Sequence, residues 1–478
     1  MAAMIATLPS PRLAPTLGAR RPGPLGKVHD AAPTSRVMVV AVMVSMVAFL
    51  DSTVVNLALP ATERDLGGGM CLQQWVVDGY LLALAAMILP GGAISDLFGR
   101  VAVMRFGLLA FGTGSALAAT AISPAMLIAG RVVQGLGAAF LVPGSLALIN
   151  STFGHARRAA AVGTWTAWTG TAFALGPLLG GLAVDLLSWR WIYVLSAVPM
   201  AVGFALTFWL RPIPRPARSA RLDVEGAALA AIGLSGSVFA LIEAGKHGWH
   251  SGFVASLVVG VAALLAFVAW QRRAPHPLVP PDLFASRTFA SANLITAFVY
   301  GALTMASLAV SLYIQEVAGY GATVAGLVTL PSPVISFLFA RRVGGLAARI
   351  GHRFFLTTGP LVAAAGLLLI RPGRGFDIAT HLLPGVILLA AGMVLTSTPL
   401  TALNLSSVQP ARGGVAAAVQ NAVGRTSALT SVACLGLIAA GRLTDASFAR
   451  LLQVAAGLFV IGALVGGFSV TKVKQICS

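Results

Sequence analysis

One carboxylate, Asp51, lies inside an otherwise uncharged apolar stretch from Val37 to Leu59. The stretch is long enough to cross a bilayer as a helix, which needs about 20 residues at a rise of about 1.5 Å per residue. A carboxylate at that depth costs roughly 2.5–3.5 kcal/mol on insertion scales, and such residues usually mark proton or solute pathways. We therefore predict that Asp51 carries protons or contacts a transported solute in a secondary transporter.

A second deep charge, Arg131, lies within a later apolar run. Arg131 is about eight residues from the start of its run and Asp51 is about eight residues from the end of its own, so both lie roughly 12 Å below the same boundary. Intramembrane charges are usually tolerated through pairing. The two side chains are predicted to form a direct or water-bridged ion pair, which serves either proton coupling or static helix bonding.

The thirteenth apolar run contains a third deep charge, Arg425, about twelve residues from its start. Together with Gln420 and Asn421 it is predicted either to line a solute cavity or to bond neighbouring helices. A cavity with one carboxylate and two cations is poorly suited to dications, so it favours monocationic, zwitterionic or neutral amphiphiles. The remaining candidate cavity residues are Asp78, Trp168, Asn293 and Tyr300.

Three further carboxylates, Asp78, Glu243 and Glu316, lie near the outer ends of their runs. Solvation at the membrane surface is the simpler explanation for carboxylates in such places. These residues are therefore weaker candidates than Asp51.

The elements that carry these residues are predicted to be membrane-spanning helices. The sequence is 57% hydrophobic and 10% charged, with a mean hydropathy of +0.89, which is typical of polytopic membrane proteins. Fourteen apolar runs of helix length follow one another with short polar breaks. Because helices satisfy their own backbone groups within lipid, the prediction is an all-α polytopic membrane protein.

The net charge of +18 follows membrane topology rather than nucleic-acid binding. Most of the 32 Lys and Arg residues fall in the two tails and in alternate loops. This bias predicts that both termini lie in the cytoplasm. The cysteines at 71, 434 and 477 have no metal-site spacing and no evident partner, so neither a metal site nor a disulfide is predicted.

An internal repeat indicates a duplicated architecture. The segment Gly92–Arg100 follows the second run, and Gly344–His352 follows the tenth run in the same register. Two six-helix halves with a solute site between them fit this arrangement. The predicted parts are a disordered cytoplasmic tail (1–36), an N-terminal half (37–210), an inserted helix pair (223–270), a C-terminal half (289–470) and a second cytoplasmic tail (471–478).

Four motifs and a following aromatic segment occur at corresponding places in the predicted helices. They are Leu50–Pro60 in the first span, Gly92–Arg100 after the second, Arg131–Ala139 in the fourth, and Gly176–Gly181 followed by Trp189–Tyr193 at the fifth. In this order they resemble the motifs of the 14-span drug:proton antiporters of the major facilitator superfamily, the EmrB/QacA type. The resemblance implies the major facilitator fold, with two six-helix halves plus two extra central helices.

The resemblance also implies a function. It implies proton-coupled export of small amphiphilic molecules or antibiotics by alternating access, with Asp51 and Arg131 in proton coupling. The proton gradient would be the energy source, without a cofactor or metal. The expected partners are a small-molecule substrate, protons and lipids of the plasma membrane, with no nucleic acid, and the chain is expected to be a monomer.

The loop motif is implied to latch the two halves together when the transporter faces outward. Its latch residues are Gly92, Asp96, Gly99 and Arg100. Leu97 and Val101 occupy positions that are often basic in the family, and the second copy has Ala348 opposite Asp96. The latch is therefore expected to be weaker and one-sided.

The fifth-helix motif is implied to form a bending seam between the halves and to indicate antiport. Gly176 and Gly180 share one helix face, which allows close approach of a neighbouring backbone. Pro177 removes one intrahelical hydrogen bond, and Gly181 completes the motif. Packing of small residues with no moving role is the alternative.

Other functions stay open. A transporter of the same fold that takes up a metabolite or moves a lipid is the first alternative. A membrane enzyme or receptor has less support, because the sequence contains no Walker-type phosphate loop, no HExxH motif and no recognisable Ser/His/Asp grouping. The chain is therefore not predicted to be an enzyme.

Overall fold

The computed structural model describes residues 31–153, 155–210, 222–373, 375–409 and 412–469. These residues form helices and connecting loops without a strand, which confirms the predicted all-α class. The first helix begins at Ala31, inside the segment predicted as a tail. Residues 1–30 and the tail predicted at 471–478 lie outside the described residues.

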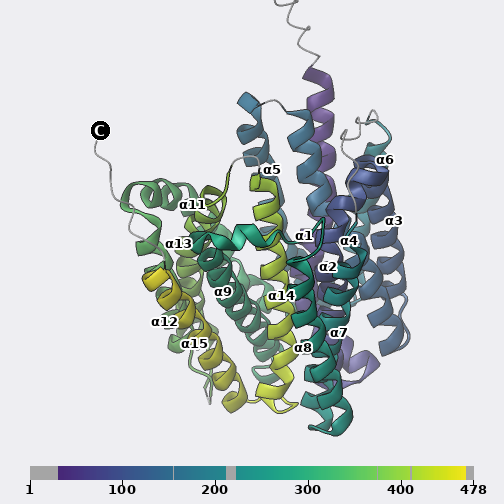
Figure 1. Ribbon diagram of the computed structural model, residues 1–478. Coiled ribbons are helices and arrows are strands. Elements are labelled where there is room, and N and C mark those ends of the chain that lie inside the picture. The colour runs from purple at the N-terminus through teal and green to yellow at the C-terminus, as the bar shows by residue number, and fades with distance from the viewer. Residues whose placement is uncertain (1–30, 154, 211–221, 374, 410–411, 470–478) are drawn as a thin grey trace, which may run out of the picture.

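The helices are numbered in chain order in Figure 1. The first group comprises α1 (Ala31–Leu66), α2 (Gly69–Phe98), α3 (Arg100–Ala119), α4 (Pro124–Thr152), α5 (His155–Leu186) and α6 (Trp191–Thr207). The central pair is α7 (Val224–His247) and α8 (Ser251–Gln271). The last group comprises α9 (Arg287–Leu312), α10 (Ala322–Thr329), α11 (Pro331–Ile350), α12 (His352–Leu369), α13 (Leu383–Ser406), α14 (Gly413–Ala439) and α15 (Asp445–Ser469). Three short turns, η1 (Pro281–Ala285), η2 (Tyr313–Val317) and η3 (Ile378–Leu382), adjoin them.

Thirteen spans among the described residues are long and apolar enough to cross a membrane, and α6 is a shorter apolar helix. With α6 included, they account for the predicted fourteen runs. One run is divided: α10 ends before Pro331, which begins α11. A proline lacks the backbone N–H that would continue the hydrogen-bond ladder, so Pro331 explains the break.

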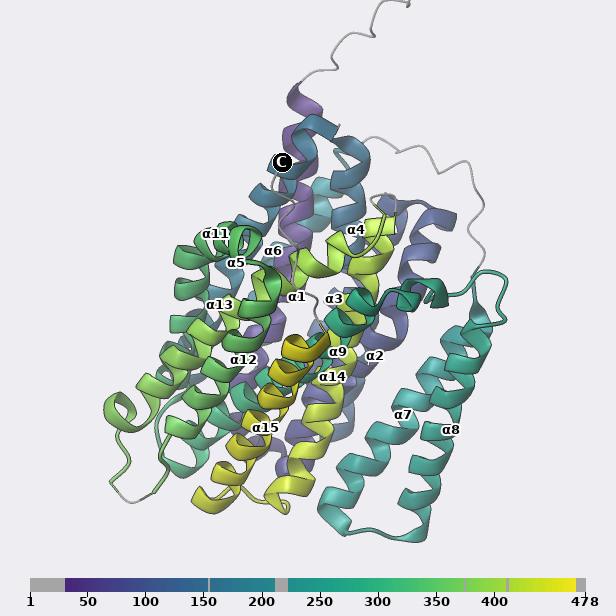
Figure 2. The same ribbon diagram turned by 60° about the vertical axis from the view of Figure 1, so that its left-hand side comes forward.

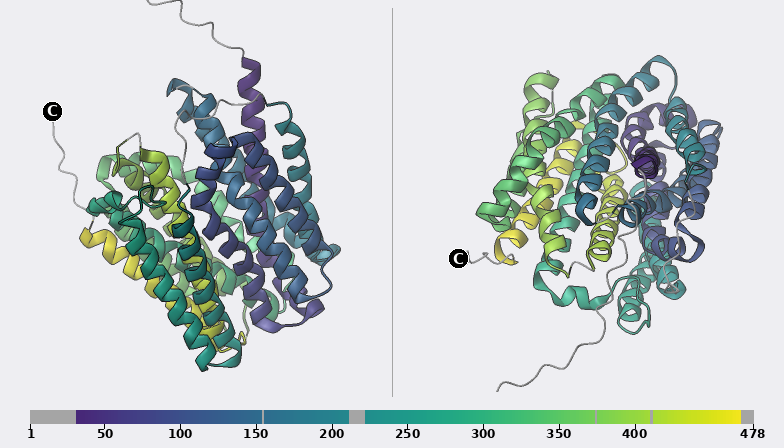
Figure 3. Two further views of the ribbon diagram at one scale, coloured as in Figure 1. Left: turned by 45° about the vertical axis from the view of Figure 1, so that its right-hand side comes forward. Right: turned by 90° about the horizontal axis from the view of Figure 1, so that it is seen from above.

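The first and last groups lie side by side, as the view along the bundle shows (Figure 3). The central pair stands at one side of the bundle, where α7 packs against α8, α2 and α14 (Figure 2). Most of α8 is exposed, as expected for a helix that faces lipid. Helix α7 therefore covers the line where α2 and α14 meet.

A polar clamp holds the α7–α8 pair at one end. The Asp223 carboxylate accepts hydrogen bonds from the Gly226 backbone N–H at 2.8 Å, Trp270 Nε1 at 2.8 Å and Gln271 Nε2 at 2.7 Å. Burial raises the pKa of Asp223, but the donated hydrogen bonds lower it by more, so the pKa lies below its ordinary value. The clamp therefore contains an ionised carboxylate.

The internal repeat recurs in the backbone. Gly99, between α2 and α3, has φ 95°, and Gly351, between α11 and α12, has φ 101°. Each donates its N–H to the carbonyl four residues earlier, on Ser95 and Ala347 respectively. Such positive φ values favour glycine, so the same backbone conformation explains why glycine occurs at this place in both copies of the repeat.

Candidate functional site

The predicted pair of Asp51 and Arg131 is a direct ion pair. Arg131 on α4 donates from its guanidinium to Asp51 Oδ2 on α1 at 2.8 Å. Asp51 is fully buried and Arg131 is 2% exposed. Each charge of this buried pair depends on the other. Removal of one partner would be strongly destabilising, because it leaves an uncompensated buried charge.

Further polar groups surround this pair. Arg131 Nε donates to the Val76 carbonyl at 2.8 Å, and the guanidinium donates to Gln134 Oε1 at 2.8 Å. Gln134 Nε2 in turn donates to Ser115 Oγ at 2.8 Å and lies 3.4 Å from Asp51 Oδ1. The ring of Tyr80 lies beneath the guanidinium, 4.5 Å from ring centroid to Arg131 Cζ. We call this set the ion-pair network.

The network contains residues that the sequence analysis did not predict. Gln134 lies three residues after Arg131 and therefore on the same face of α4, which is a signal that could have identified it. Ser115 on α3 and the Val76 carbonyl on α2 carry no such signal, because only the packing of these helices brings them to Arg131.

Asp78 is buried more deeply than the sequence indicated. Helix α2 begins at Gly69, earlier than the apolar run, and the Asp78 side chain is fully buried. Neither carboxyl oxygen has a hydrogen-bond partner among the described residues. Burial without donors favours the neutral, protonated carboxyl group. The prediction of interfacial solvation is therefore wrong for Asp78.

Arg425 lies on α14, between α2 and α9, and is partly buried. Its guanidinium is within electrostatic reach of the Tyr80 and Tyr300 phenols. The adjacent Gly424 lies close to the Tyr300 ring and to Thr296 on α9. Among the described residues Arg425 has neither a hydrogen bond nor an ion pair. Helix bonding, one of its two predicted roles, is therefore not observed.

The other candidate cavity residues separate into two sets. Asn293 and Gln420 belong to a network that joins α9, α13 and α14: Asn293 Nδ2 donates to Asn404 Oδ1 at 3.2 Å, and Asn404 Nδ2 donates to Gln420 Oε1 at 3.0 Å. Gln420 Nε2 also lies 3.3 Å from Thr296 Oγ1. Tyr300 and Asn421 are partly buried, whereas Trp168 is 59% exposed.

The fifth-helix motif packs on two different neighbours. A Cβ added at Gly176 would collide with Thr53, and one at Gly180 would lie 2.9 Å from Val54 Cβ, both on α1. A Cβ at Gly181 would lie 2.6 Å from Thr323 Cα on α10. Gly176 and Gly180 therefore set a distance within the first group of helices. The expectation that they set the distance between the halves is wrong, and Gly181 occupies that contact.

Pro177 also takes part in the contact between α5 and α10. Its carbonyl lies against Gly326 of α10, where any Cβ would collide with it. Asp185, near the end of α5, accepts backbone hydrogen bonds from Ala322 at 2.9 Å and Thr323 at 2.8 Å, the first residues of α10. A carboxylate satisfies unpaired N–H groups at a helix N-terminus and interacts favourably with its dipole. Asp185, which was not predicted, therefore ties the two groups of helices together.

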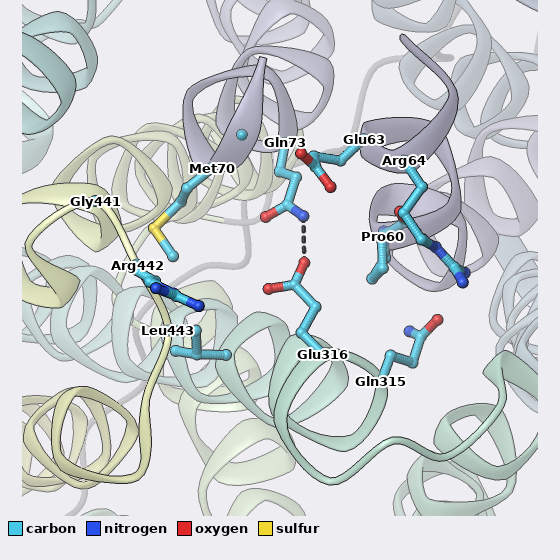
Figure 4. Close-up of a pocket in the computed structure, with 11 residues that line it drawn as sticks. Pro60, Glu63, Arg64, Met70, Gln73, Gln315, Glu316, Gly441, Arg442 and Leu443 are labelled. Carbon is cyan, nitrogen blue, oxygen red and sulfur yellow. Dashed lines mark hydrogen bonds between the residues drawn. The ribbon is translucent and has the colours of Figure 1, made fainter. Parts of the chain in front are cut away.

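Several bonds between the groups lie at the end of the bundle that carries the α1–α2 loop, drawn at the bottom of Figure 1. We call this the α1–α2 end. Gln73 on α2 donates to Glu316 on η2, and Gln74 donates to the Val432 carbonyl of α14 at 2.6 Å. The Gln73–Glu316 bond crosses a shallow pocket of about 500 Å³ between Met70, Arg442 and Pro60 (Figure 4).

The loop motif has a simpler geometry. Asp96 in the last turn of α2 and Arg100 at the start of α3 form an ion pair at 3.3 Å across the turn at Gly99. Gly99 provides a turn of positive φ between the two helices. Gly92 is exposed, and a Cβ there would meet open space, so close helix approach at Gly92 is not observed.

Known proteins extend this picture. The Major Facilitator Superfamily model matches residues 41–432. The puromycin resistance protein pur8 of Streptomyces alboniger is 36% identical over 414 residues, which cover 84% of this chain and 81% of that protein. The methylenomycin A resistance protein of Bacillus subtilis (strain 168) is 33% identical over 446 residues, which cover 90% of this chain and 94% of that protein.

A solved structure shares the fold. The crystal structure of an auto-inhibited POT family peptide transporter superposes with a TM-score of 0.68 and covers 93% of this chain and 98% of its own. Its sequence identity is 18%, so the likeness concerns the fold alone. The match of the family to residues 41–432 and the resistance proteins at 33–36% identity show that the chain belongs to the Major Facilitator Superfamily.

Proposed function

We propose that the chain is a proton-coupled exporter of small amphiphilic molecules, antibiotics among them, of the 14-span drug:proton antiporter type. Two kinds of observation support the proposal. Relatives that cover most of the chain are named as resistance proteins for puromycin and methylenomycin A, and another is named a cephamycin export protein. The observation that carries proton coupling is the fully buried Asp51, bonded to Arg131 within a membrane-spanning helix.

The proposed proton cycle depends on Asp51, which differs from the other buried carboxyl group, Asp78, in its partners. In this conformation Asp51 is paired with Arg131, whereas Asp78 has no hydrogen-bond donor among the described residues, which favours its neutral form. Protonation of Asp51 removes the charge that holds Arg131, so it releases the guanidinium from α1. Movement of α1 against α4 would then follow the protonation state of Asp51.

Access to the cavity follows from the bonds between the two groups of helices. With both termini in the cytoplasm, as the charge bias predicts, the α1–α2 end faces outward. The Asp185 and Gln73 bonds then close the outer side in this conformation. In the opposite conformation these bonds break, and the loop with Asp96 and Arg100 would latch the inner side. All these groups belong to one chain, so the proposed cycle needs no second copy and would operate in a monomer.

Growth and accumulation measurements test the proposal. Cells that express the chain are screened for resistance to puromycin and methylenomycin A, and accumulation of the protecting compound is measured with and without an uncoupler. The proposal predicts low accumulation that rises when the uncoupler is added. Accumulation above that of control cells would indicate uptake instead, and no difference would exclude transport of the compound.

Asp51→Asn provides the residue-level test of export. This variant should accumulate the compound as uncoupled cells do, at matched protein levels. Glu225→Gln changes an exposed carboxylate at the start of α7 and serves as the control, which should export like the parent.

A further inference from the structure

Of the described ionisable side chains near the middle of the bundle, some are paired or neutral and one, Arg425, has no partner that balances its charge. Asp51 and Arg131 neutralise one another at 2.8 Å. Asp78 has no hydrogen-bond donor among the residues that the structure describes, which favours its neutral form. Arg425 has neither a hydrogen bond nor an ion pair with any described residue. The uncompensated charge in this region is therefore one guanidinium.

Arg425 lies where the two groups of helices meet. Its helix, α14, packs against α2 of the first group and against α9 of the last. Tyr80 of α2 is within electrostatic reach of Arg425 and also of the Asp51–Arg131 pair, and Tyr300 of α9 lies within reach of Arg425 as well. Arg425 and Tyr300 are partly exposed, whereas Tyr80 is only 2% exposed, so a solute between the groups would meet the Arg425 guanidinium and the Tyr300 ring.

A guanidinium in this position calls for an anionic partner. An unpaired charge inside a membrane protein is unfavourable, and residues that carry one usually face a solute pathway or pair with another group. The side chain of Arg425 is partly exposed and has no hydrogen-bond or ion-pair partner among the described residues. A guanidinium matches the geometry of a carboxylate, to which it can donate two parallel hydrogen bonds. The partly exposed aromatic ring of Tyr300 is suited to the apolar body of such a molecule.

We propose that Arg425 binds an acidic group of the exported molecule, so that the preferred substrates are amphiphiles that carry a carboxylate, whether anionic or zwitterionic. The inference rests on the proposed export function and narrows its substrate class. It also revises the expectation drawn from the sequence, which included monocationic and neutral amphiphiles. The sequence placed two cations in the cavity, whereas the structure neutralises one of them, Arg131, through Asp51.

Three dansyl probes of similar shape and different charge test the inference. Dansylglycine carries one carboxylate, dansylglycinamide is its neutral counterpart, and dansylcadaverine carries one ammonium group. Binding of each to the full chain in lipid nanodiscs is measured by fluorescence titration. The parent should bind dansylglycine about tenfold more tightly than dansylglycinamide, the difference expected for one hydrogen-bonded charge pair. Dansylcadaverine should bind most weakly.

Variants of Arg425 identify the source of the preference. Arg425→Gln should weaken dansylglycine binding about tenfold while the Kd of dansylglycinamide is unchanged, which also shows that the site is folded. Arg425→Lys keeps the charge and should retain part of the preference. Arg272→Gln removes an exposed guanidinium at the end of α8 and should bind like the parent. If Arg425→Gln does not fold, reduced but persistent preference in Arg425→Lys supports the inference, and full or absent preference overturns it.

The outcomes separate the inference from the proposed function. A parent that binds dansylglycine no better than dansylglycinamide, or an Arg425→Gln variant with unchanged preference, overturns the inference. Export is measured independently, as uncoupler-sensitive efflux from cells. Energised efflux of dansylcadaverine without carboxylate preference would leave export intact and refute the role of Arg425. Carboxylate preference that depends on Arg425 without energised efflux of any probe would support the binding site and contradict export.

Discussion

A methyl group at Gly181 should hold the α1–α2 end open. The added Cβ of Gly181→Ala would lie 2.6 Å from Thr323 Cα and 2.7 Å from the Ala322 carbonyl oxygen. Carbon atoms in good contact are about 3.5–4.0 Å apart, so α5 and α10 must separate by about 1 Å. Overpacking of this kind costs roughly 1–3 kcal/mol. Because the contact joins the two groups of helices, the cost falls on the closed conformation and shifts the population roughly 5- to 150-fold toward the open one.

A distance measurement between the two groups reports this shift. Spin labels at Leu187→Cys, after α5, and Tyr320→Cys, before α10, are attached to chains in which the native cysteines are replaced by serine. The distance distribution of Gly181→Ala should be longer than that of the parent. Gly170→Ala is the matched control, since its Cβ meets open space on the same helix. The same distribution in Gly181→Ala and Gly170→Ala would refute the assignment of Gly181 to the contact between the halves.

Three further outcomes are expected. Asp185→Ala removes the cap on α10 and should weaken closure of the α1–α2 end by about 1 kcal/mol. The same spin-label pair would report this change as a longer mean distance, and an unchanged distance distribution would contradict the role of the cap. In the clamp, the carboxyl pKa of Asp223 lies below its ordinary value. The ionised carboxylate therefore stabilises the folded α7–α8 pair above about pH 4, and this stabilisation is lost as the pH falls through the lower folded-state pKa. The hydrogen-exchange protection factors at that end of α7 and α8, which correct for the intrinsic pH dependence of exchange, should therefore be constant from about pH 8 to 5 and fall only below about pH 4. Lower protection already near pH 6 would contradict this sign. A cysteine at Arg349, on the last turn of α11, should be labelled only from the cytoplasm, and labelling only from outside would reverse the topology.

The sequence predicted those features that depend on local pattern. Apolar runs predicted the helices, and equal depth predicted the contact of Asp51 with Arg131, because rise per residue is constant along a helix. The internal repeat predicted that two parts of the chain correspond, and the structure shows matching turns of positive φ at Gly99 and Gly351.

Features that depend on packing between distant helices were not predictable from one sequence. Asp78 seemed close to a membrane surface because the apolar run starts after the first turn of α2, yet the helix begins at Gly69 and its neighbours bury the carboxyl group. Gly180 and Gly181 are adjacent in sequence, but they face α1 and α10 respectively. The rotation of α5 about its own axis decides which glycine faces the other half, and a sequence motif does not specify that rotation.

Proton-driven export through Asp51 is the central claim, and transport by purified protein tests it most directly. The parent, Asp51→Asn and Glu225→Gln are reconstituted in proteoliposomes, and transport of the compound to which the chain confers resistance is measured with and without an imposed pH gradient. Loss of the Asp51 charge removes the group that binds both the proton and Arg131, so Asp51→Asn should show no acceleration by the gradient while the parent and Glu225→Gln do. Full gradient-driven transport by a folded Asp51→Asn variant would contradict the account and make Asp78 the next candidate for the proton carrier.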